Sequence, residues 1–337
     1  MKAIAYTHNL AIDQPESLLD LILPDPQPGE FDLLVEVKAI SVNPVDVKIR
    51  ANVAPEGGAA KVLGWDAAGV VRAVGSKVSL FRPGDKVWYA GSLTRPGANS
   101  ELHVVDERIV GRVPQSLGFA EAAALPLTSI TAWELLFDRL QVLHNDAAAG
   151  KSLLIVGAAG GVGSILTQLA RQLTGLTVIG TASRPETQSW VRGLGAHHVV
   201  DHGKPLEPQL QALGIAGVDY IASLNQSGSH FGQLAAIVAP QGRIALIDDP
   251  DMIDVRLLKR KSVSLHWEFM FTRSMFNTED IIKQHRILNR LANLIDAGTV
   301  KTTVAEHFGA INAANLKKAH ALIESNRAKG KIVLEGF

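Results

Sequence analysis

The stretch SLLIVGAAGGVGSILTQLAR, residues 152–171, holds four glycines between an apolar run and a helix-spaced run. Its first nineteen residues carry no charge, which raises the alternative of a membrane span of about 20 apolar residues. The glycines argue against a span, because each costs about 1 kcal/mol in a helix interior. A strand that turns through glycines into a helix exposes backbone N–H groups and the positive end of the helix dipole, which together bind a pyrophosphate. We therefore predict a dinucleotide site at Gly157, Gly160, Gly161, Val162 and Gly163, with an ordinary strand-to-helix turn as the alternative.

The ribose of such a nucleotide is recognised at the end of the second strand, about 20 residues beyond the glycine turn. Here the chain reads Thr181-Ala182-Ser183-Arg184. No Asp or Glu in this run can accept hydrogen bonds from the ribose hydroxyls, whereas a hydroxyl and a guanidinium suit a 2′-phosphate. Ser183 and Arg184 therefore predict NADPH rather than NADH as the cofactor. The alternative is that Arg184 is a solvated residue at a helix start, and Glu186 is close to it in sequence.

The composition excludes several classes of function. Lys plus Arg and Asp plus Glu both number 33, so no net field attracts nucleic acid or an anionic membrane. The chain has no cysteine, which removes disulfides, thiolate nucleophiles and zinc sites built from Cys. The N-terminus becomes polar after four or five residues, too early for the apolar core of a signal peptide, so a cytoplasmic location is expected.

The elements that position these residues follow from the apolar patterns. Residues 31–110 contain Val- and Ile-rich runs broken by Pro and Gly, which predict a compact β domain. Helical spacing begins near Phe119. After Lys151, short apolar strands alternate with helices, as a parallel sheet covered on both faces requires. The fold class is therefore α/β, with a doubly wound parallel sheet and a second, β-rich domain.

The chain resembles the medium-chain dehydrogenase/reductase superfamily, on its quinone oxidoreductase and zinc-type alcohol dehydrogenase-like side. The resemblance rests on NPVD, LGWDAAGVVRAVG, GDKV, AAALPLTSITAW, VGAAGGVGS and GKIVL, which occur in the family's order over nearly the full length. It implies a GroES-like catalytic domain formed by residues 1–126 and 272–337. It also implies a Rossmann domain at residues 127–271, with cofactor and substrate in the cleft between the two domains.

The departures from this family concern zinc. Zinc-dependent relatives place a Cys where Asn43 stands and a Gly-His-Glu run where this chain has Gly64-Trp65-Asp66. They also carry a lobe with four cysteines. The residues that remain at these positions cannot assemble a tetrahedral zinc site, so we expect no metal.

Without a metal, the oxidation of a simple alcohol is poorly supported, because zinc enzymes rely on the ion to lower the pKa of the alcohol. Reduction of a quinone or a conjugated enone suits the chain better, because hydride transfer gives a delocalised anion that hydrogen-bond donors stabilise. By resemblance, Asn43 and Thr128 are the predicted donors, and Asp46 orients Asn43 or a water or delivers a proton. The alternatives are a turn cap for Asn43, a helix N-cap for Thr128, and a surface ion pair with Lys48 or Arg50 for Asp46.

Flat apolar side chains predict a slot for an aromatic acceptor at Trp65, Trp88, Tyr89 and Phe269, with core packing as the alternative. Lys331 is predicted to reach the cofactor phosphate, with a solvated lysine as the alternative. By resemblance, the last Rossmann strand is where two subunits pair into a homodimer.

These observations predict a zinc-independent, NADPH-dependent oxidoreductase that transfers hydride to quinones or α,β-unsaturated carbonyls. Two alternatives stay open. One is an alcohol dehydrogenase with an atypical zinc site, and the other is a low-turnover NADPH-binding sensor or structural protein. The expected partner is a small molecule, with neither nucleic acid nor membrane involved.

Overall fold

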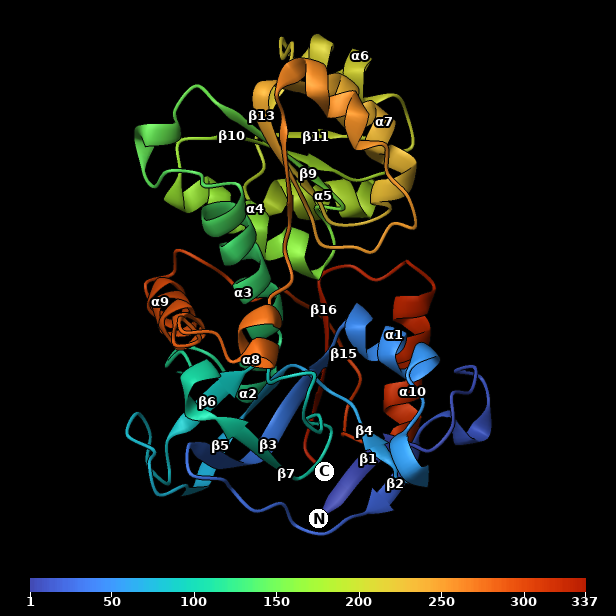
Figure 1. Cartoon of the computed structure of the whole chain (residues 1–337), viewed down its shortest axis with the longest axis vertical. Coiled ribbons are helices and arrows are strands. Elements are labelled where there is room, and N and C mark those ends of the chain that lie inside the picture. Colours follow the sequence, from blue (N-terminus) through green and yellow to red (C-terminus); the bar gives the residue numbers. More distant parts are fainter. The chain divides into compact units, whose positions relative to one another are not determined.

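The computed structural model describes residues 1–337 and divides the chain into two compact units (Figure 1). Unit 1 comprises Met1–Ile130 and Phe271–Phe337, and unit 2 comprises Thr131–Met270. The sequence placed these boundaries after residues 126 and 271. The first boundary differs because helix α3, Pro126–Trp133, runs across it.

Unit 2 is built on a six-stranded sheet in the order β11-β10-β9-β12-β13-β14, in which every pair is parallel. Its strands are β9 (Ser152–Val156), β10 (Thr177–Thr181), β11 (His198–Val200), β12 (Val218–Ser223), β13 (Val238–Leu246) and β14 (Ser264–Trp267). The order reverses at β9, the first strand, which is the arrangement of a dinucleotide-binding sheet. This confirms the predicted doubly wound domain.

Helices cover both faces of this sheet, because right-handed crossovers in opposite directions from β9 place them on opposite sides. They are α4 (Gly161–Leu173), α5 (Pro185–Gly193), α6 (Leu206–Ala212) and α7 (Ser227–Ile237). Within unit 2, α4 and α5 lie on one side of the strands in Figure 1, and α6 and α7 lie on the other. All five residues of β9 are buried, as its uninterrupted apolar run predicts.

Unit 1 contains a seven-stranded sheet in the order β15-β16-β3-β5-β6-β8, with β7 also paired to β3, and a three-stranded sheet in the order β2-β1-β4. The strands are β1 (Lys2–Tyr6), β2 (Leu19–Ile22), β3 (Asp32–Val42), β4 (Lys61–Val62), β5 (Ala67–Val74), β6 (Lys86–Tyr89), β7 (Leu102–Asp106), β8 (Val110–Arg112), β15 (Val304–His307) and β16 (Lys331–Glu335). The helices are α1 (Pro44–Asn52), α2 (Phe119–Ala123), α8 (Thr272–Phe276), α9 (Lys283–Asp296) and α10 (Ala313–Glu324), besides the start of α3.

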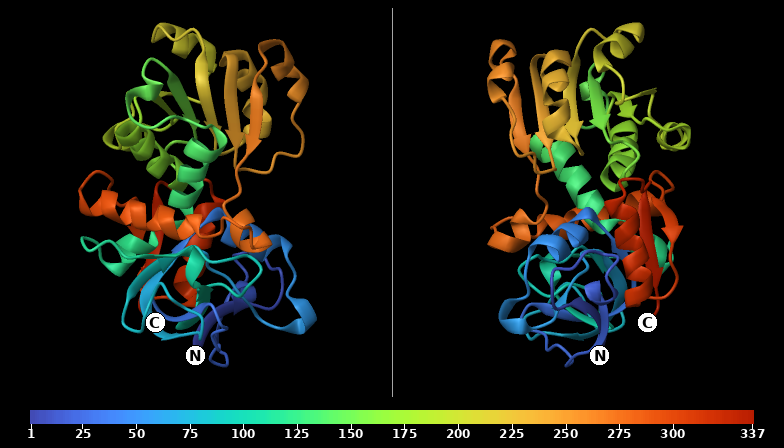
Figure 2. Two further views of the ribbon diagram at one scale, coloured as in Figure 1. Left: turned by 60° about the vertical axis from the view of Figure 1, so that its left-hand side comes forward. Right: turned by 90° about the vertical axis from the view of Figure 1, so that its right-hand side faces the viewer.

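The two ends of the chain meet in unit 1. Strand β16 pairs antiparallel with β3, and the register places Ile332 opposite Val42. Helix α10, red in Figure 2, lies beside α1, which is blue. The last strand therefore brings Lys331 next to the turn that begins at Asn43.

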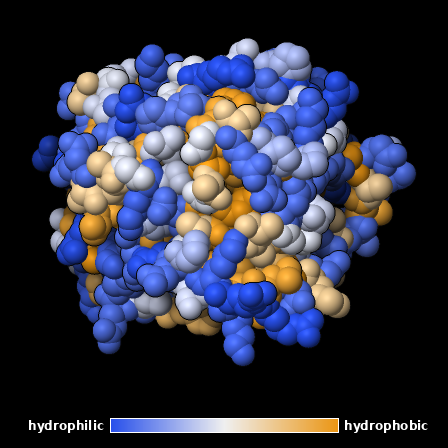
Figure 3. Space-filling model, turned by 90° about the horizontal axis from the view of Figure 1, so that it is seen from above, coloured by the Kyte–Doolittle hydropathy of each residue, from blue (hydrophilic) through white to orange (hydrophobic).

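No helix of the chain is long and apolar enough to cross a membrane. The segment 152–171 is divided into β9 and α4 by the glycine turn, which is why its apolar length does not form one helix. The face seen in Figure 3 mixes hydrophilic and hydrophobic residues without one continuous apolar surface.

Candidate active site

Three charged or amide side chains meet inside unit 1. Asn43 stands between β3 and α1, Asp66 directly precedes β5, and Lys331 is the first residue of β16. Their exposed fractions are 1%, 0% and 3%. Because the three residues lie at the ends of β3, β5 and β16, which are neighbours in one sheet, the fold fixes their positions. We call these three residues the ion cluster.

The Lys331 ammonium is surrounded by three oxygen acceptors. Its Nζ lies 3.0 Å from Asp66 Oδ2 and 3.1 Å from the Val42 carbonyl oxygen, and it also donates to Asn43 Oδ1. An ammonium has three N–H donors. All three are matched by acceptors of the protein itself.

Asp66 is surrounded by donors. Its Oδ2 accepts from Asn43 Nδ2 at 2.8 Å, and its Oδ1 accepts from the backbone N–H of Leu127 at 2.8 Å. Burial raises the pKa of Asp66, while the Lys331 ammonium and these hydrogen bonds oppose the rise. Since every partner donates, the arrangement suits an ionised carboxylate.

Asp46 lies beside the ion cluster in the first turn of α1. Its exposed fraction is 1%, and its Oδ2 accepts from the backbone N–H of Asn43 at 2.6 Å. Burial raises the pKa of Asp46 to about 7, against the lowering effects of that hydrogen bond and of the Lys331 charge. The surface ion pair with Lys48 or Arg50 does not form, because Asp46 is buried and Arg50 pairs with Glu324 of α10. The geometry favours the part of the prediction in which Asp46 orients Asn43.

Three buried titratable side chains, His320 of α10, His103 of β7 and Asp46 of α1, make the stability of unit 1 depend on pH. Burial lowers the pKa of His320 from 6.5 to about 3, with Arg50 adding to the effect, and burial lowers the pKa of His103 from 6.5 to about 4. As pH falls below 6.5, the unfolded chain binds these two protons and the native chain does not. Asp46 has the opposite sign, because its native pKa of about 7 lies above its ordinary value of 3.8, and the stability that it contributes is lost as pH rises.

We therefore expect these three groups together to add about 1.4 kcal/mol per pH unit to the free energy of unfolding between about pH 4.5 and about pH 6, the net effect of one proton. Neither ring nitrogen of His320 has a hydrogen-bond partner, so His320→Leu removes one titration without breaking a bond. In urea denaturation, its free energy of unfolding should rise less steeply with pH than that of wild type, by about 1.4 kcal/mol per pH unit. The exposed control His8→Leu should keep the wild-type slope, and an unchanged slope in His320→Leu would show that this histidine is not buried neutral.

Thr128 is buried in the first turn of α3, and its hydroxyl donates to the Leu125 carbonyl oxygen at 3.2 Å. This is not the N-cap that the sequence offered as its alternative, since the hydroxyl donates and the residue lies inside the helix.

The predicted pocket aromatics lie in different surroundings. Trp65, Trp88 and Tyr89 are at most 1% exposed and pack in the core of unit 1, which is the alternative that the sequence left open. Trp65 donates from its indole to the Ser92 carbonyl oxygen and meets Phe271 edge to face at 6.5 Å. Phe269, in unit 2, is 46% exposed. Their role as pocket walls stays a prediction.

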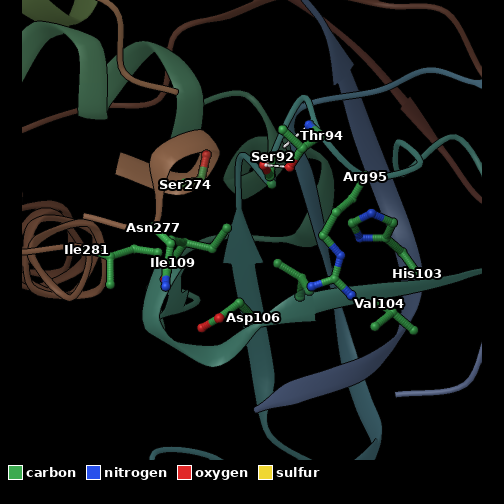
Figure 4. A pocket seen from close by; sticks show the side chains of 12 residues that line it. Ser92, Thr94, Arg95, His103, Val104, Asp106, Ile109, Ser274, Asn277 and Ile281 are labelled. Atoms are coloured by element: carbon green, nitrogen blue, oxygen red, sulfur yellow. Dashed lines mark hydrogen bonds between the residues drawn. The ribbon is translucent and has the colours of Figure 1, made fainter. Parts of the chain in front are cut away.

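Unit 1 also contains a cavity of about 80 Å³, shown in Figure 4. Ser92, Thr94 and Arg95 line it from one loop, and Ser274 and Asn277 line it from α8 and the turn that follows. A groove of about 670 Å³ shares Thr94 and Arg95 with it. Neither is lined by the ion cluster or by the predicted aromatics.

His103, which also lines this cavity, is held at both ring nitrogens. Nδ1 lies 3.0 Å from the Tyr89 hydroxyl, and Nε2 lies 3.0 Å from the Pro96 carbonyl oxygen. A histidine engaged in this way has no nitrogen left for a ligand.

The residues present do not fit a tetrahedral zinc ion. At the positions of the three metal-site residues of zinc relatives stand an amide, an indole and the carboxylate of Asp66, and that carboxylate already binds an ammonium. No group of three or more His, Cys, Asp or Glu side chains in the chain is arranged to hold a metal ion.

In unit 2, the glycine turn has the geometry of a phosphate site. Gly157 has a positive φ of 80°, and Gly160 precedes α4 with no side chain to cap the helix. A Cβ at Gly163 would lie 2.5 Å from the Gly157 carbonyl oxygen, so this glycine is needed for the turn itself. At Gly160 the only atom within 4 Å is that same oxygen, at 3.5 Å. Packing alone therefore does not require glycine at position 160.

Ser183 and Arg184 follow β10 at the same edge of the sheet as the glycine turn, because β9 and β10 are parallel neighbours. Ser183 is exposed, and Arg184 pairs with Glu186 at 3.4 Å. The closeness of Glu186 in the sequence was one reason for the alternative, in which Arg184 is a solvated residue at a helix start.

Two residues at this edge of the sheet, Thr181 and His202, were not among the site residues predicted from the sequence. Thr181 Oγ1 accepts from the Gly157 N–H at 3.1 Å and lies 3.0 Å from His202 Nδ1, which follows β11. Their positions at strand ends, next to the glycine turn in a parallel sheet, were the available signal.

Comparisons with known proteins agree with this architecture. Residues 29–132 match the family model described as alcohol dehydrogenase GroES-like domain, and residues 194–334 match zinc-binding dehydrogenase. A zinc-type alcohol dehydrogenase-like protein of Staphylococcus epidermidis is 38% identical over 99% of both chains.

Among solved structures, a protein from Rhizobium etli CFN 42, provisionally named a zinc-dependent alcohol dehydrogenase, is 57% identical with a TM-score of 0.97, covering 100% of this chain and 98% of that one. The Escherichia coli quinone oxidoreductase complexed with NADPH is 26% identical with a TM-score of 0.83, covering 99% of this chain and 100% of that one. The chain therefore belongs to the medium-chain dehydrogenase/reductase superfamily of oxidoreductases and is a zinc-type alcohol dehydrogenase-like member of it.

Proposed function

We propose that this protein is a zinc-independent, NADPH-dependent reductase of quinones or α,β-unsaturated carbonyls. The observation that carries the proposal is the set of side chains where zinc relatives hold their metal by resemblance: Asn43 is an amide, Trp65 is an indole, and the Asp66 carboxylate already binds Lys331. The quinone oxidoreductase named above, which was solved with NADPH, supports the same reaction class. We further propose a homodimer formed through the edge strand β14, where Trp267 is 53% exposed, and a cytoplasmic location.

NADPH, when bound, supplies a hydride, and the acceptor takes up that hydride and one proton from water to give a hydroquinone or a saturated ketone. The residues of the chain bind and orient. In this proposal the N–H groups at Gly160 to Gly163 hold the pyrophosphate, and Ser183 and Arg184 hold the 2′-phosphate.

Asn43 keeps one amide hydrogen beyond its bond to Asp66, and this is the donor that we assign to the developing oxyanion. The Thr128 hydroxyl donates a hydrogen bond to the Leu125 carbonyl oxygen, so in the proposal its oxygen acts toward a ligand only as an acceptor. Asp46 holds the Asn43 backbone in place.

The test is a panel of quinones, enones and simple alcohols, assayed with NADPH and NADH in parallel, before and after EDTA. We expect reduction of conjugated acceptors, no alcohol oxidation and no effect of chelation. Bound zinc together with chelator-sensitive alcohol oxidation would point to an atypical zinc dehydrogenase. Tight NADPH binding without turnover of any acceptor would point to a sensor or structural protein.

Arg184→Leu tests the choice of nucleotide. We expect the Kd for NADPH to rise about tenfold, the value of one hydrogen bond to a charged group, and the Kd for NADH to stay unchanged, since NADH lacks the 2′-phosphate. Fluorescence titration measures both. Glu186→Gln is the matched control, because it releases Arg184 from its ion pair and should leave NADPH affinity equal or stronger. Equal losses for both nucleotides would remove Arg184 from the phosphate site.

A further inference from the structure

The connection between β12 and α7 lies against the glycine turn in unit 2. The register places Ser223, the last residue of β12, opposite Val156, the last residue of β9, and the Leu224 N–H donates to the Val156 carbonyl oxygen at 3.2 Å. A Cβ at Gly157 would lie 3.5 Å from Asn225 Cβ. Since β12 and β10 lie on opposite sides of β9, this connection flanks the glycine turn on the side away from β10.

The topology relates this side of the sheet to one half of a dinucleotide. A dinucleotide-binding sheet consists of two mononucleotide-binding halves that meet at its first strand. Ser183 and Arg184, which we propose for the adenosine half, follow β10, whereas β12 and β13 lie on the other side of β9. On the proposed function, the connection after β12 therefore belongs to the nicotinamide half.

Asn225 is a polar side chain of this connection that is available to a ligand. It is exposed, and its amide makes no hydrogen bond within the chain. The other side chain within 4 Å of a Cβ at Gly157 is that of Leu224, which is apolar. An amide offers two N–H donors and one oxygen acceptor. The ribose hydroxyls and the carboxamide of a nicotinamide riboside supply acceptors and donors that match them.

Asp248, which follows β13, holds the far end of the connection. Its Oδ2 accepts from the Ser227 backbone N–H at 2.8 Å, and its Oδ1 accepts from the Ser227 hydroxyl. That hydroxyl donates its single hydrogen to Asp248, so the Ser223 hydroxyl, 2.7 Å away, donates to Ser227 Oγ. Both serines are 0% exposed. One chain of hydrogen bonds therefore joins the ends of β12 and β13 to the start of α7.

The backbone at Gln226 is constrained by these bonds. Its φ of 53° and ψ of 36° lie in the left-handed region, which residues other than glycine rarely adopt. Such a conformation persists where the surrounding structure determines it. Here the next residue, Ser227, is held through its N–H and its hydroxyl by Asp248. Without these bonds, the connection could relax and Asn225 could move away from the glycine turn.

We propose that Asn225 binds the nicotinamide half of the nucleotide and that Asp248 is the positioning residue that holds Asn225 beside the glycine turn. The inference rests on the proposed function, because it takes NADPH as the ligand. Its readouts are binding constants, so it does not depend on the turnover of any acceptor.

The first experiment removes the amide. Asn225→Ala keeps the Cβ that faces Gly157, so the packing on the glycine turn is preserved. By isothermal titration we expect the Kd for NADPH to rise about fivefold, the value of one hydrogen bond. The Kd for adenosine 2′,5′-bisphosphate, which lacks the nicotinamide riboside, should stay within about twofold of wild type. An unchanged Kd for NADPH, or an equal loss for both ligands, would overturn the proposal.

The second experiment tests whether Asp248 acts by position or by charge. Asp248→Ala removes both acceptors of Ser227 and should weaken NADPH about threefold or more, again without weakening the bisphosphate. Asp248→Asn keeps an acceptor for the N–H of Ser227, as asparagine does at helix starts, and its NH₂ group can donate to the hydroxyl oxygen. Its Kd for NADPH should therefore lie within about twofold of wild type. If Asp248→Asn is as weak as Asp248→Ala, the charge is responsible and the positioning role is wrong.

Asp254→Ala is the matched control. Asp254 is an exposed acid in the same crossover between β13 and β14, and it accepts from the Arg256 backbone N–H at 3.1 Å at the start of a short helix. Its removal also deletes one negative charge and one helix cap from unit 2. Both Kd values should stay at the wild-type level, and a loss of NADPH affinity here would contradict the assignment of the effect to Asp248.

The double variant Asn225→Ala/Asp248→Ala tests whether Asp248 acts through Asn225. If it does, the second substitution adds little, and the Kd for NADPH should lie within about twofold of that of Asn225→Ala. Fully additive losses would show two independent effects and overturn the proposal. If wild type binds NADPH but reduces no acceptor, the proposed function fails, while these Kd values still decide the roles of Asn225 and Asp248.

Discussion

Asp66→Ala is expected to lower the free energy of unfolding by about 3 to 5 kcal/mol, the usual cost of leaving one partner of a buried ion pair alone. The substitution strands the Lys331 ammonium at 3% exposure. It also removes the acceptor of the Asn43 amide and of the Leu127 N–H. Urea denaturation measures the loss.

The double variant Asp66→Leu/Lys331→Met provides the comparison for this prediction. Removing both charges replaces the pair by apolar side chains, which often preserves stability. We therefore expect the double variant to be more stable than Asp66→Ala, although it carries one more substitution. If Asp66→Ala loses less than about 1 kcal/mol, as exposed ion pairs do, the cluster is not buried as described.

Gly163→Ala is expected to abolish NADPH binding, with the Kd raised about a hundredfold or more, and to cost about 1 to 3 kcal/mol of stability through overpacking. The added Cβ would lie 2.5 Å from the Gly157 carbonyl oxygen and 2.6 Å from Ala158 Cα, both backbone atoms. The turn must therefore shift. Isothermal titration with NADPH and thermal unfolding measure the two effects.

Gly160→Ala separates an effect on nucleotide affinity from an effect on the stability of the fold. Its backbone, with φ of −72° and ψ of 179°, suits any residue, and its Cβ would meet only one atom within 4 Å. We expect stability within about 0.5 kcal/mol of wild type together with a Kd for NADPH raised about tenfold, because the methyl group blocks the approach of the pyrophosphate. Wild-type affinity in this variant would show that the phosphate binds elsewhere.

The sequence was most informative where local pattern decides structure. Four glycines after an apolar run defined the end of β9 and the start of α4, because Gly157 has a positive φ and Gly163 has no space for a Cβ. The alternation of short apolar runs with helices likewise predicted the parallel sheet, and the structure and the family comparisons confirm that fold. The positions of Ser183 and Arg184 at the end of β10 follow from the same periodicity.

The ion cluster could not be predicted in this way. Lys331 and Asp66 are 265 residues apart in the sequence, and they meet through the pairing of β16 with β3 and of β3 with β5. A lysine in a strand is usually solvated, so its pattern favoured a surface role. The sequence left two positions open for Trp65 and Trp88, because large aromatic side chains suit both the wall of a substrate slot and a packed core.

The pairing of β16 with β3 also governs the order in which the protein matures during synthesis. Unit 2 is a continuous segment, Thr131–Met270, and can fold while the rest of the polypeptide is still being made. Strand β16 (Lys331–Glu335) is synthesised after that segment. Asp66 therefore waits for its counter-charge until β16 has been synthesised, and a chain that stops before Lys331 contains all of unit 2 but leaves the Asp66 carboxylate without its ammonium.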